Sequence, residues 1–117
     1  MKETVKTIMD WHEKTFPNAT LCGQLLKYKE EREEYEESKS MLELADMFIV
    51  ACGVGRFDSL AAAECFSFIP DLLACNGGVG AYAEFQECIN SKMEKNRKRV
   101  WNETADGAYH HENGIED

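Results

Sequence analysis

Residues 41–54 are the part of the chain that most constrains its fold. The segment reads MLELADMFIVACGV, and Glu43 and Asp46 are its only charged residues. A continuous apolar run of this length, without regular alternation of apolar and polar residues, is typical of a helix covered on nearly every side. Because burying an unpaired carboxylate is strongly unfavourable, the two acidic residues in this helix need partners.

The rest of the chain supplies helices that can cover this segment. Apolar periodicity and capping residues predict helices over residues 3–15, about 20–37, 40–54, 60–69 and 82–99, and Pro70 restarts or kinks the fourth. Asn18 or Thr20, Ser40, and Asp58 or Ser59 are the expected N-caps. We therefore expect an all-α fold, a bundle of about five helices built around an antiparallel helical hairpin. Residues 1–101 form a single domain in this prediction, and residues 102–117 form an irregular C-terminal tail.

Charge and cysteine content narrow the possible functions. A formal net charge of −9 argues against nonspecific binding to nucleic acid or to an anionic membrane. The charged N-terminus lacks an apolar signal region, and no run reaches the roughly eighteen apolar residues of a membrane helix. The five cysteines contain no CxxC pair and lie mostly in apolar surroundings, which favours reduced residues in a cytoplasmic protein.

The acidic helix before residue 38 and the apolar helix after residue 40 are joined by a short connection, so we expect them to pack antiparallel. Residues equidistant from the turn of a symmetric hairpin lie at the same depth. A turn near residues 38 and 39 therefore pairs Glu34 with Glu43, and Glu31 with Asp46. On each helix the two acidic residues are spaced i,i+3 and share one face, so four carboxylates can converge. A longer connection would weaken this register.

The chemistry of these carboxylates points to a hard cation. In the competing register, Glu30 and Glu33 would lie opposite Met47 and Leu44, which cannot bind such an ion. Converging carboxylates repel one another, and ligands that are all oxygen suit Mg²⁺ or Mn²⁺ better than Zn²⁺. Magnesium held by carboxylates keeps positions open for water and substrate phosphates.

Parts of this pattern have simpler explanations. A Glu-rich run such as residues 30–37 is usually a solvated helix face. Ser40-x-x-Glu43 is also a capping box, which would explain Glu43 without a metal. Asp46 lies beyond the first helical turn, between Ala45 and Met47, and is the hardest of the acidic residues to explain structurally.

The acidic motif resembles that of a known family. Glu30-Glu31-x-x-Glu34 followed by Glu43-x-x-Asp46 resembles the EExxE…ExxD signature of the MazG-like all-α nucleoside triphosphate pyrophosphohydrolases. Residues 44–47 are similar to that family's ELADV segment, and residues 92–101 (KMEKNRKRVW) to the basic K…N…R…W stretch of short phage-type members. The resemblance covers residues 20–101 and is strongest in the acidic motif.

The resemblance implies a magnesium-dependent hydrolase, with Mn²⁺ as a possible substitute, that converts an NTP or dNTP to its monophosphate and pyrophosphate. It assigns metal binding to Glu31, Glu34, Glu43 and Asp46. Glu30 matches the family's additional acidic position, and we take Glu30 and Glu31 as the catalytic candidates for orienting or deprotonating the attacking water.

The basic segment near residue 95 supplies candidate nucleotide-binding residues. Lys92, Lys95 and Arg99 can neutralise phosphate charge, and Asn96 can bond a phosphate, the sugar or the base. Cations at this position also stabilise a helix C-terminus, which is the structural alternative. Candidates for stacking on a base are Trp101, His12, Tyr109 and His110, although such residues are more often part of the packing or of an irregular tail.

Three functions remain open from the sequence. The first is the nucleotide pyrophosphohydrolase. The second is a catalytically weak nucleotide- or metal-binding module of the same fold, favoured by the nine-residue step from Glu34 to Glu43, which is shorter than in typical family members. The third is an acidic helical protein that binds a basic partner without metal. A homo-oligomer, either a dimer or a tetramer, is also expected, because the segment 41–54 is apolar on nearly every side and the resemblance implies it.

Overall fold

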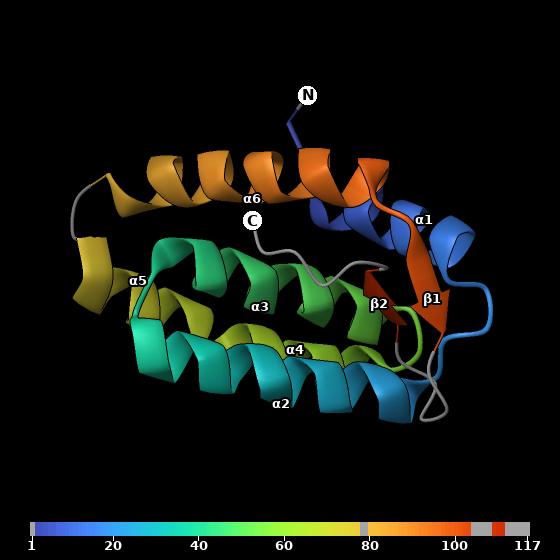
Figure 1. Ribbon diagram of the computed structural model, residues 1–117. Helices are drawn as coiled ribbons and strands as arrows, with labels where there is room; N and C mark the ends of the chain where they lie inside the picture. The colour runs from blue at the N-terminus through green and yellow to red at the C-terminus, as the bar shows by residue number, and fades with distance from the viewer. Residues whose placement is uncertain (1, 78–79, 104–108, 112–117) are drawn as a thin grey trace.

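The computed structural model describes the backbone of residues 2–77, 80–103 and 109–111. Within these residues the chain forms six α-helices and one antiparallel pair of short strands (Figure 1). The elements are α1 (Val5–Thr15), α2 (Leu21–Ser38), α3 (Met41–Gly55), α4 (Ser59–Ser67), α5 (Ile69–Gly77), α6 (Ala81–Lys98), β1 (Trp101–Glu103) and β2 (Tyr109–His111). The predicted helical fold is confirmed, with the fourth expected helix divided in two.

Helix α3 is the centre of the bundle. It contacts α1, α2, α4, α5 and α6, and it lies between α2 and α6 in Figure 1. Leu44, Met47, Cys52 and Val54 are fully buried along it. The apolar character of α3 is therefore satisfied within one chain and does not by itself require a second copy. The expected homo-oligomer stays a prediction.

Local signals set the ends of these helices. Thr20 and Asp58, rather than Asn18 and Ser59, are the N-caps of α2 and α4, and each accepts hydrogen bonds from backbone N–H groups of the first turn. Pro70 is the second residue of α5, where a missing backbone N–H disrupts no helical hydrogen bond. Phe68 separates α4 from α5, so the proline ends one helix and starts the next as expected.

Part of the predicted irregular tail forms a hairpin. Trp101 pairs with His111, and Glu103 pairs with Tyr109, across an antiparallel register. The first strand is anchored to the bundle, because the Trp101 indole N–H donates to the backbone carbonyl of Asn96 over 3.1 Å. Residues 104–108 and 112–117 of the predicted tail lie outside the described residues.

A buried polar latch fixes the N-terminus on α6. The Glu3 carboxylate, 5% exposed, receives two hydrogen bonds from the Arg97 guanidinium, at 2.8 and 3.0 Å. The Glu3 backbone N–H donates to Asn90 Oδ1 over 2.9 Å, and Gln86 Nε2 donates to the Glu3 carbonyl over 2.9 Å. These bonds join residues more than 80 positions apart in sequence, and they hold the start of α1 against α6.

None of the described helices is long and apolar enough to cross a membrane. The five cysteines are free. Cys52 and Cys65 are buried as expected, Cys88 is half-buried, and Cys22 and Cys75 are exposed.

A close approach at Gly53 gives a test of this packing. A Cβ atom at Gly53 would lie 2.6 Å from Gln24 Oε1 and 2.8 Å from the His12 ring. We expect Gly53→Ala to reduce the free energy of unfolding by about 1–3 kcal/mol, because buried side chains must move.

Gly55→Ala is the matched control, since the nearest atom to its added Cβ would be 3.6 Å away. It should be neutral or stabilising by up to about 1 kcal/mol, the helix-propensity gain over glycine. Thermal or urea unfolding of both variants measures the difference, and equal stabilities would contradict the packing at Gly53.

Candidate functional site

The connection between α2 and α3 sets the register of the acidic residues. Helix α2 ends at Lys39, which adopts the left-handed conformation (φ 57°) and donates its N–H to the Tyr35 carbonyl. Ser40 then caps α3 by accepting the Leu42 N–H. The chain thus reverses direction over two residues, the short connection that the predicted hairpin register requires.

The register brings acidic side chains from both helices together. Oxygen atoms of Glu31, Glu43 and Asp46 lie within 4.8 Å of one another. Glu34 lines the same pocket as Glu31 and Asp46, and its side chain is a hydrogen-bond neighbour of Glu43. The four carboxylates predicted to converge therefore belong to one acidic cluster, with Glu31, Glu43 and Asp46 as its compact core.

Two lysines partly neutralise the acidic cluster. Lys92, on α6, is 4% exposed, and its Nζ lies 3.0 Å from Asp46 Oδ2. Lys27 Nζ lies 4.0 Å from Glu31 Oε1. Among the described residues, Glu31 Oε2 and Glu43 Oε2 are buried without a hydrogen-bond partner. Buried carboxylate oxygens normally have a polar partner, and a cation could act as the partner of these two oxygens.

Burial and mutual repulsion shift the protonation of the acidic cluster. Burial, followed by the Asp46 charge, raises the pKa of Glu31 to about 8. The same causes raise the pKa of Glu43 to about 7. Burial also raises the pKa of Asp46, against the opposing effect of the Lys92 ammonium. A bound divalent cation would favour the ionised form of all three.

The two simpler explanations, a solvated helix face and a capping box, do not account for the buried oxygens of the acidic cluster. Glu33 is exposed on α2, and Glu30 is also exposed, 3.8 Å from Lys27, as expected for a solvated helix face. The Ser40 backbone N–H donates to Ser38 Oγ, so it is not capped by Glu43. The capping-box interpretation therefore does not account for the buried Glu43 oxygen.

An aromatic pocket of about 130 Å³ adjoins the acidic cluster. Trp11 and Phe16, their ring centroids 5.2 Å apart, come from α1 and the residue after it, and Trp101 lies 5.3 Å from Phe16. Glu31, Glu34 and Asp46 line the same pocket from α2 and α3. Aromatic rings and carboxylates thus line one cavity.

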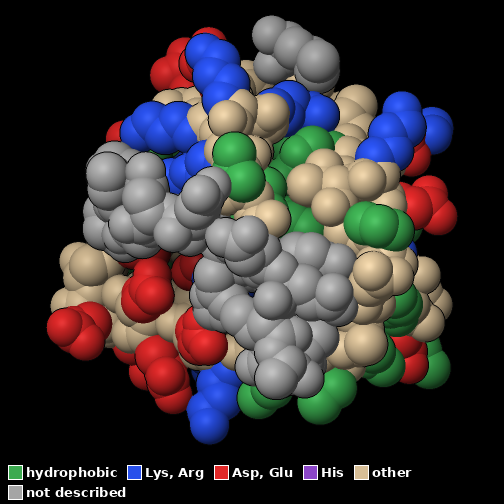
Figure 2. Space-filling view, turned by 45° about the vertical axis from the view of Figure 1, so that its right-hand side comes forward, with side chains coloured by type: hydrophobic (Ala, Val, Ile, Leu, Met, Phe, Trp, Pro, Cys, Tyr) green, Lys and Arg blue, Asp and Glu red, His purple; other side chains and the backbone are tan. Residues whose placement is uncertain are grey.

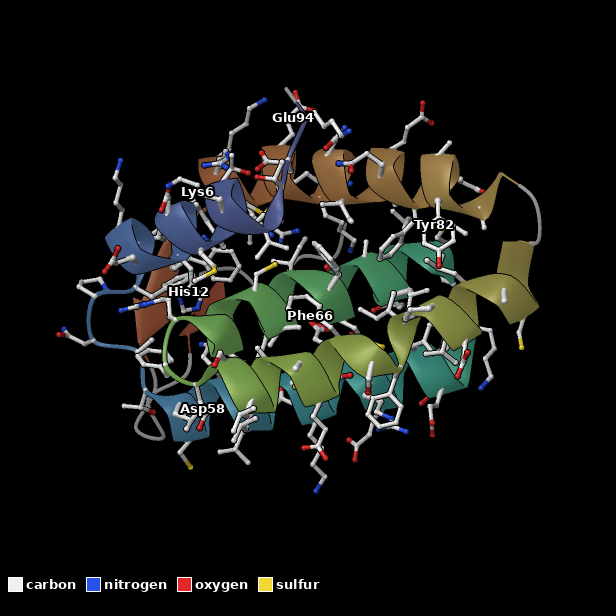
Figure 3. All side chains as sticks on the ribbon, turned by 180° about the vertical axis from the view of Figure 1, so that it is seen from behind. Lys6, His12, Asp58, Phe66, Tyr82 and Glu94 are labelled. Carbon is white, nitrogen blue, oxygen red and sulfur yellow. The ribbon has the colours of Figure 1, made fainter. Side chains whose placement is uncertain are left out.

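Polar side chains also enter this pocket. They are His12, Gln24, Lys27, Asn96 and Arg99. Figure 3 shows His12 between α1 and α3, whereas Lys6 points away from the bundle. Burial, followed by the nearby Arg56 charge, lowers the pKa of His12 to about 4, so the imidazole is neutral at pH 7.

The basic segment contributes unevenly to the pocket. Asn96 and Arg99 line it, and Arg99 donates to Asn96 Oδ1 over 3.2 Å. Lys92 pairs with Asp46, so in this structure it neutralises a carboxylate, where we expected it to meet phosphate. Lys95 is exposed and does not line the pocket.

Of the four residues predicted as candidates for stacking on a base, two lie at the pocket. Trp101 and His12 line the pocket, and their stacking on a base stays a prediction. The side chains of Tyr109 and His110 lie outside the described residues. Sequence analysis missed Trp11, Phe16 and Gln24 as pocket residues. The close spacing of Trp11, His12 and Phe16 at one helix end was the available signal.

Charge is unevenly distributed on the surface around the site. On the face in Figure 2, acidic side chains gather at the lower left, and Lys and Arg side chains follow the upper edge. Exposed glutamates are concentrated on α2, and the last turn of α6 carries exposed Lys95, Arg97 and Lys98, with exposed Glu94 beside it. The acidic side favours cations, and the basic side favours anionic groups such as phosphates.

Comparison with protein-family models, with curated protein sequences and with solved structures yields no match to this chain. The family assignment therefore stays a prediction based on the acidic motif.

The raised pKa of Glu31 predicts how metal-free stability depends on pH. The folded chain holds this proton up to about pH 8, while the unfolded chain releases it near 4.5. Since the folded state binds more protons between these values, its stability falls as pH rises through that window. Glu31→Gln removes this loss. We expect it to match wild type near pH 5 and to exceed it by on the order of 2 kcal/mol near pH 8 in EDTA.

Unfolding measured at both pH values, with Glu33→Gln as the exposed control on the same helix, tests this expectation. Parallel pH profiles for wild type and Glu31→Gln would show that Glu31 is not buried in a repulsive cluster.

The Lys92–Asp46 pair predicts a second stability difference. Lys92→Met should destabilise the metal-free protein by on the order of 3 kcal/mol at neutral pH, because Asp46 loses its buried partner. Lys98→Met is the control: Lys98 forms an exposed pair with Glu94, and its loss should change stability by less than about 1 kcal/mol. Equal effects in urea unfolding would contradict a buried role for Lys92.

Proposed function

We propose that this protein is a magnesium-dependent nucleoside triphosphate pyrophosphohydrolase, which releases pyrophosphate and a nucleoside monophosphate. The observation that carries the proposal is the pair of buried, unpartnered oxygens, Glu31 Oε2 and Glu43 Oε2, in a cluster beside an aromatic pocket. A cation site and a slot for a flat ring in one cavity match the two ends of a metal–nucleotide complex.

The residues of the acidic cluster fit magnesium or manganese. All the candidate ligands are carboxylate oxygens, with Glu31, Glu43 and Asp46 in the core and Glu34 beside them. When bound there, Mg²⁺ would neutralise charge that develops on the phosphate oxygens and on the departing pyrophosphate.

The chain's own residues have distinct roles in this proposal. The Trp11, Phe16 and Trp101 rings enclose the base, and Arg99 and Asn96 meet polar groups of the nucleotide. Glu34 is exposed within the pocket and can accept a proton from the attacking water. Glu30 does not line the pocket, so a catalytic role for it would require indirect action.

Pyrophosphate release is the direct test. We expect wild type to release pyrophosphate from at least one of the eight common NTPs and dNTPs in Mg²⁺, but not in EDTA. Asp46→Asn should lower the rate by more than about 100-fold, since even residues that only support a metal ligand contribute about 10- to 100-fold. Asp71→Asn, an exposed position on α5, is the matched control and should keep the wild-type rate.

Thermal unfolding separates the alternatives if no pyrophosphate appears. A rise in Tm with Mg²⁺ that Asp46→Asn abolishes would indicate the binding module of the same fold. The absence of both turnover and metal stabilisation would contradict the proposal and favour an acidic surface for a basic protein partner.

A further inference from the structure

A chain of polar contacts fixes the orientation of His12 behind the aromatic pocket. Arg56 NH1 lies 3.0 Å from His12 Nδ1, and it also donates to the backbone carbonyls of His12 and Phe16. A guanidinium can only donate, so Nδ1 must be the accepting nitrogen. The neutral ring therefore carries its proton on Nε2.

His12 in turn fixes the orientation of Gln24. The two side chains form a hydrogen bond, and Gln24 Oε1 and His12 Nε2 lie 2.6 and 2.8 Å from the point where a Cβ of Gly53 would lie. Because His12 Nε2–H is a donor, the amide oxygen of Gln24 is the group that faces it. The absence of a side chain at Gly53 allows this contact against α3.

The amide nitrogen of Gln24 can then donate a hydrogen bond into the pocket. Gln24 is 4% exposed and lines the cavity, and no described residue accepts a hydrogen bond from its Nε2. Asn96 is oriented in the same sense, since its Oδ1 accepts from Arg99 and its Nδ2 has only the weak acceptor Met93 Sδ at 3.7 Å. The cavity thus offers two amide donors.

We propose that Gln24 is a specificity residue, which donates a hydrogen bond to a carbonyl oxygen of the nucleobase and thereby disfavours adenine. The inference rests on the proposed function for the identity of the ligand as a nucleotide. Arg56 and His12 are positioning residues, because they act through the orientation of Gln24.

The chemistry of adenine explains the discrimination. An amide side chain recognises adenine with both of its groups, the oxygen accepting from N6 and the nitrogen donating to N7. In this pocket the Gln24 oxygen is turned toward His12 and the amide nitrogen faces the cavity, so an adenine N6 amino group placed against Gln24 would meet a donor and not an acceptor. Adenine has no carbonyl oxygen, whereas guanine, hypoxanthine and the pyrimidine bases carry one or two.

Deoxyinosine and deoxyadenosine are the sharpest pair of probes, since they share a purine ring and differ at position 6 in an oxygen against an amino group. The only two tryptophans, Trp11 and Trp101, line the pocket, so quenching of tryptophan fluorescence reports binding there. We expect wild type to bind deoxyinosine about tenfold more tightly, the effect of one well-placed hydrogen bond. Equal affinities, or no quenching by either nucleoside, would overturn the proposal.

Two variants of Gln24 assign the preference to its amide. Gln24→Met keeps the length of the side chain and removes its donor, and should reduce the affinity ratio to near one. Gln24→Glu replaces the donor by an acceptor, and should shift the ratio toward deoxyadenosine. A ratio unchanged in either variant, with cooperative unfolding confirming a folded chain, would contradict the role of Gln24. Should both variants fail to fold, the wild-type ratio decides alone.

The positioning role of Arg56 has its own readout. Arg56→Met should reduce the affinity ratio, and Arg56→Lys, which keeps a donor for His12 Nδ1, should restore it. Arg32→Met, on the exposed side of α2 against Phe68, is the control and should leave the ratio unchanged. A loss of stability without a change in ratio would show that Arg56 is only structural.

The nucleoside assay needs neither metal nor turnover, so its outcome is independent of pyrophosphate release. Selective binding without turnover would support the role of Gln24 and contradict the proposed enzyme activity. Metal-dependent turnover with no preference between the two nucleosides would support the enzyme activity and contradict the proposed role of Gln24.

Discussion

The burial of like charges between α2 and α3 is the constraint on which the site depends. Glu31, Glu43 and Asp46 hold carboxylate oxygens within 4.8 Å of one another, with Glu31 buried and the other two half-buried. Such an arrangement is unfavourable unless protons or cations compensate it. The structure supplies one close cation, Lys92, and leaves two buried oxygens unpartnered. A folded chain that tolerates this arrangement gives up stability at this one place, as functional sites often do.

The position of α3 lets the bundle tolerate that strain. Five helices contact α3, and most of its apolar side chains are buried in the core, with Leu42 exposed. The Glu3–Arg97 latch holds α1 against α6, and so places Trp11 and His12 at the same end as the acidic cluster. Covering α3 and assembling the pocket are therefore consequences of one packing arrangement.

In the proposed function, the pocket and the acidic cluster have separate chemical tasks. Carboxylates from α2 and α3 suit a divalent cation and the phosphates it would bring, while aromatic rings from α1 and β1 suit a flat base. The Arg56–His12–Gln24 chain reaches the same pocket and turns the amide nitrogen of Gln24 toward it. Because the two parts differ in most of their residues, the proposed metal binding and the proposed base preference should respond to different substitutions.

Much of the helical framework was predictable because its signals are local. Apolar periodicity located the helices, Thr20, Ser40 and Asp58 were recognisable caps, and Pro70 marked the break between α4 and α5. The register of the acidic pairs followed from the short turn at Lys39. In a symmetric helical hairpin, residues equally far from the turn lie at the same depth on the two helices. What only the tertiary structure decided depends on contacts between residues distant in sequence: the pairing of Lys92 with Asp46, the Glu3–Arg97 latch, and the closing of the aromatic pocket by Trp101. These contacts depend on how the helices pack together. Helix periodicity and capping residues are local signals, so they do not predict which distant residues come into contact.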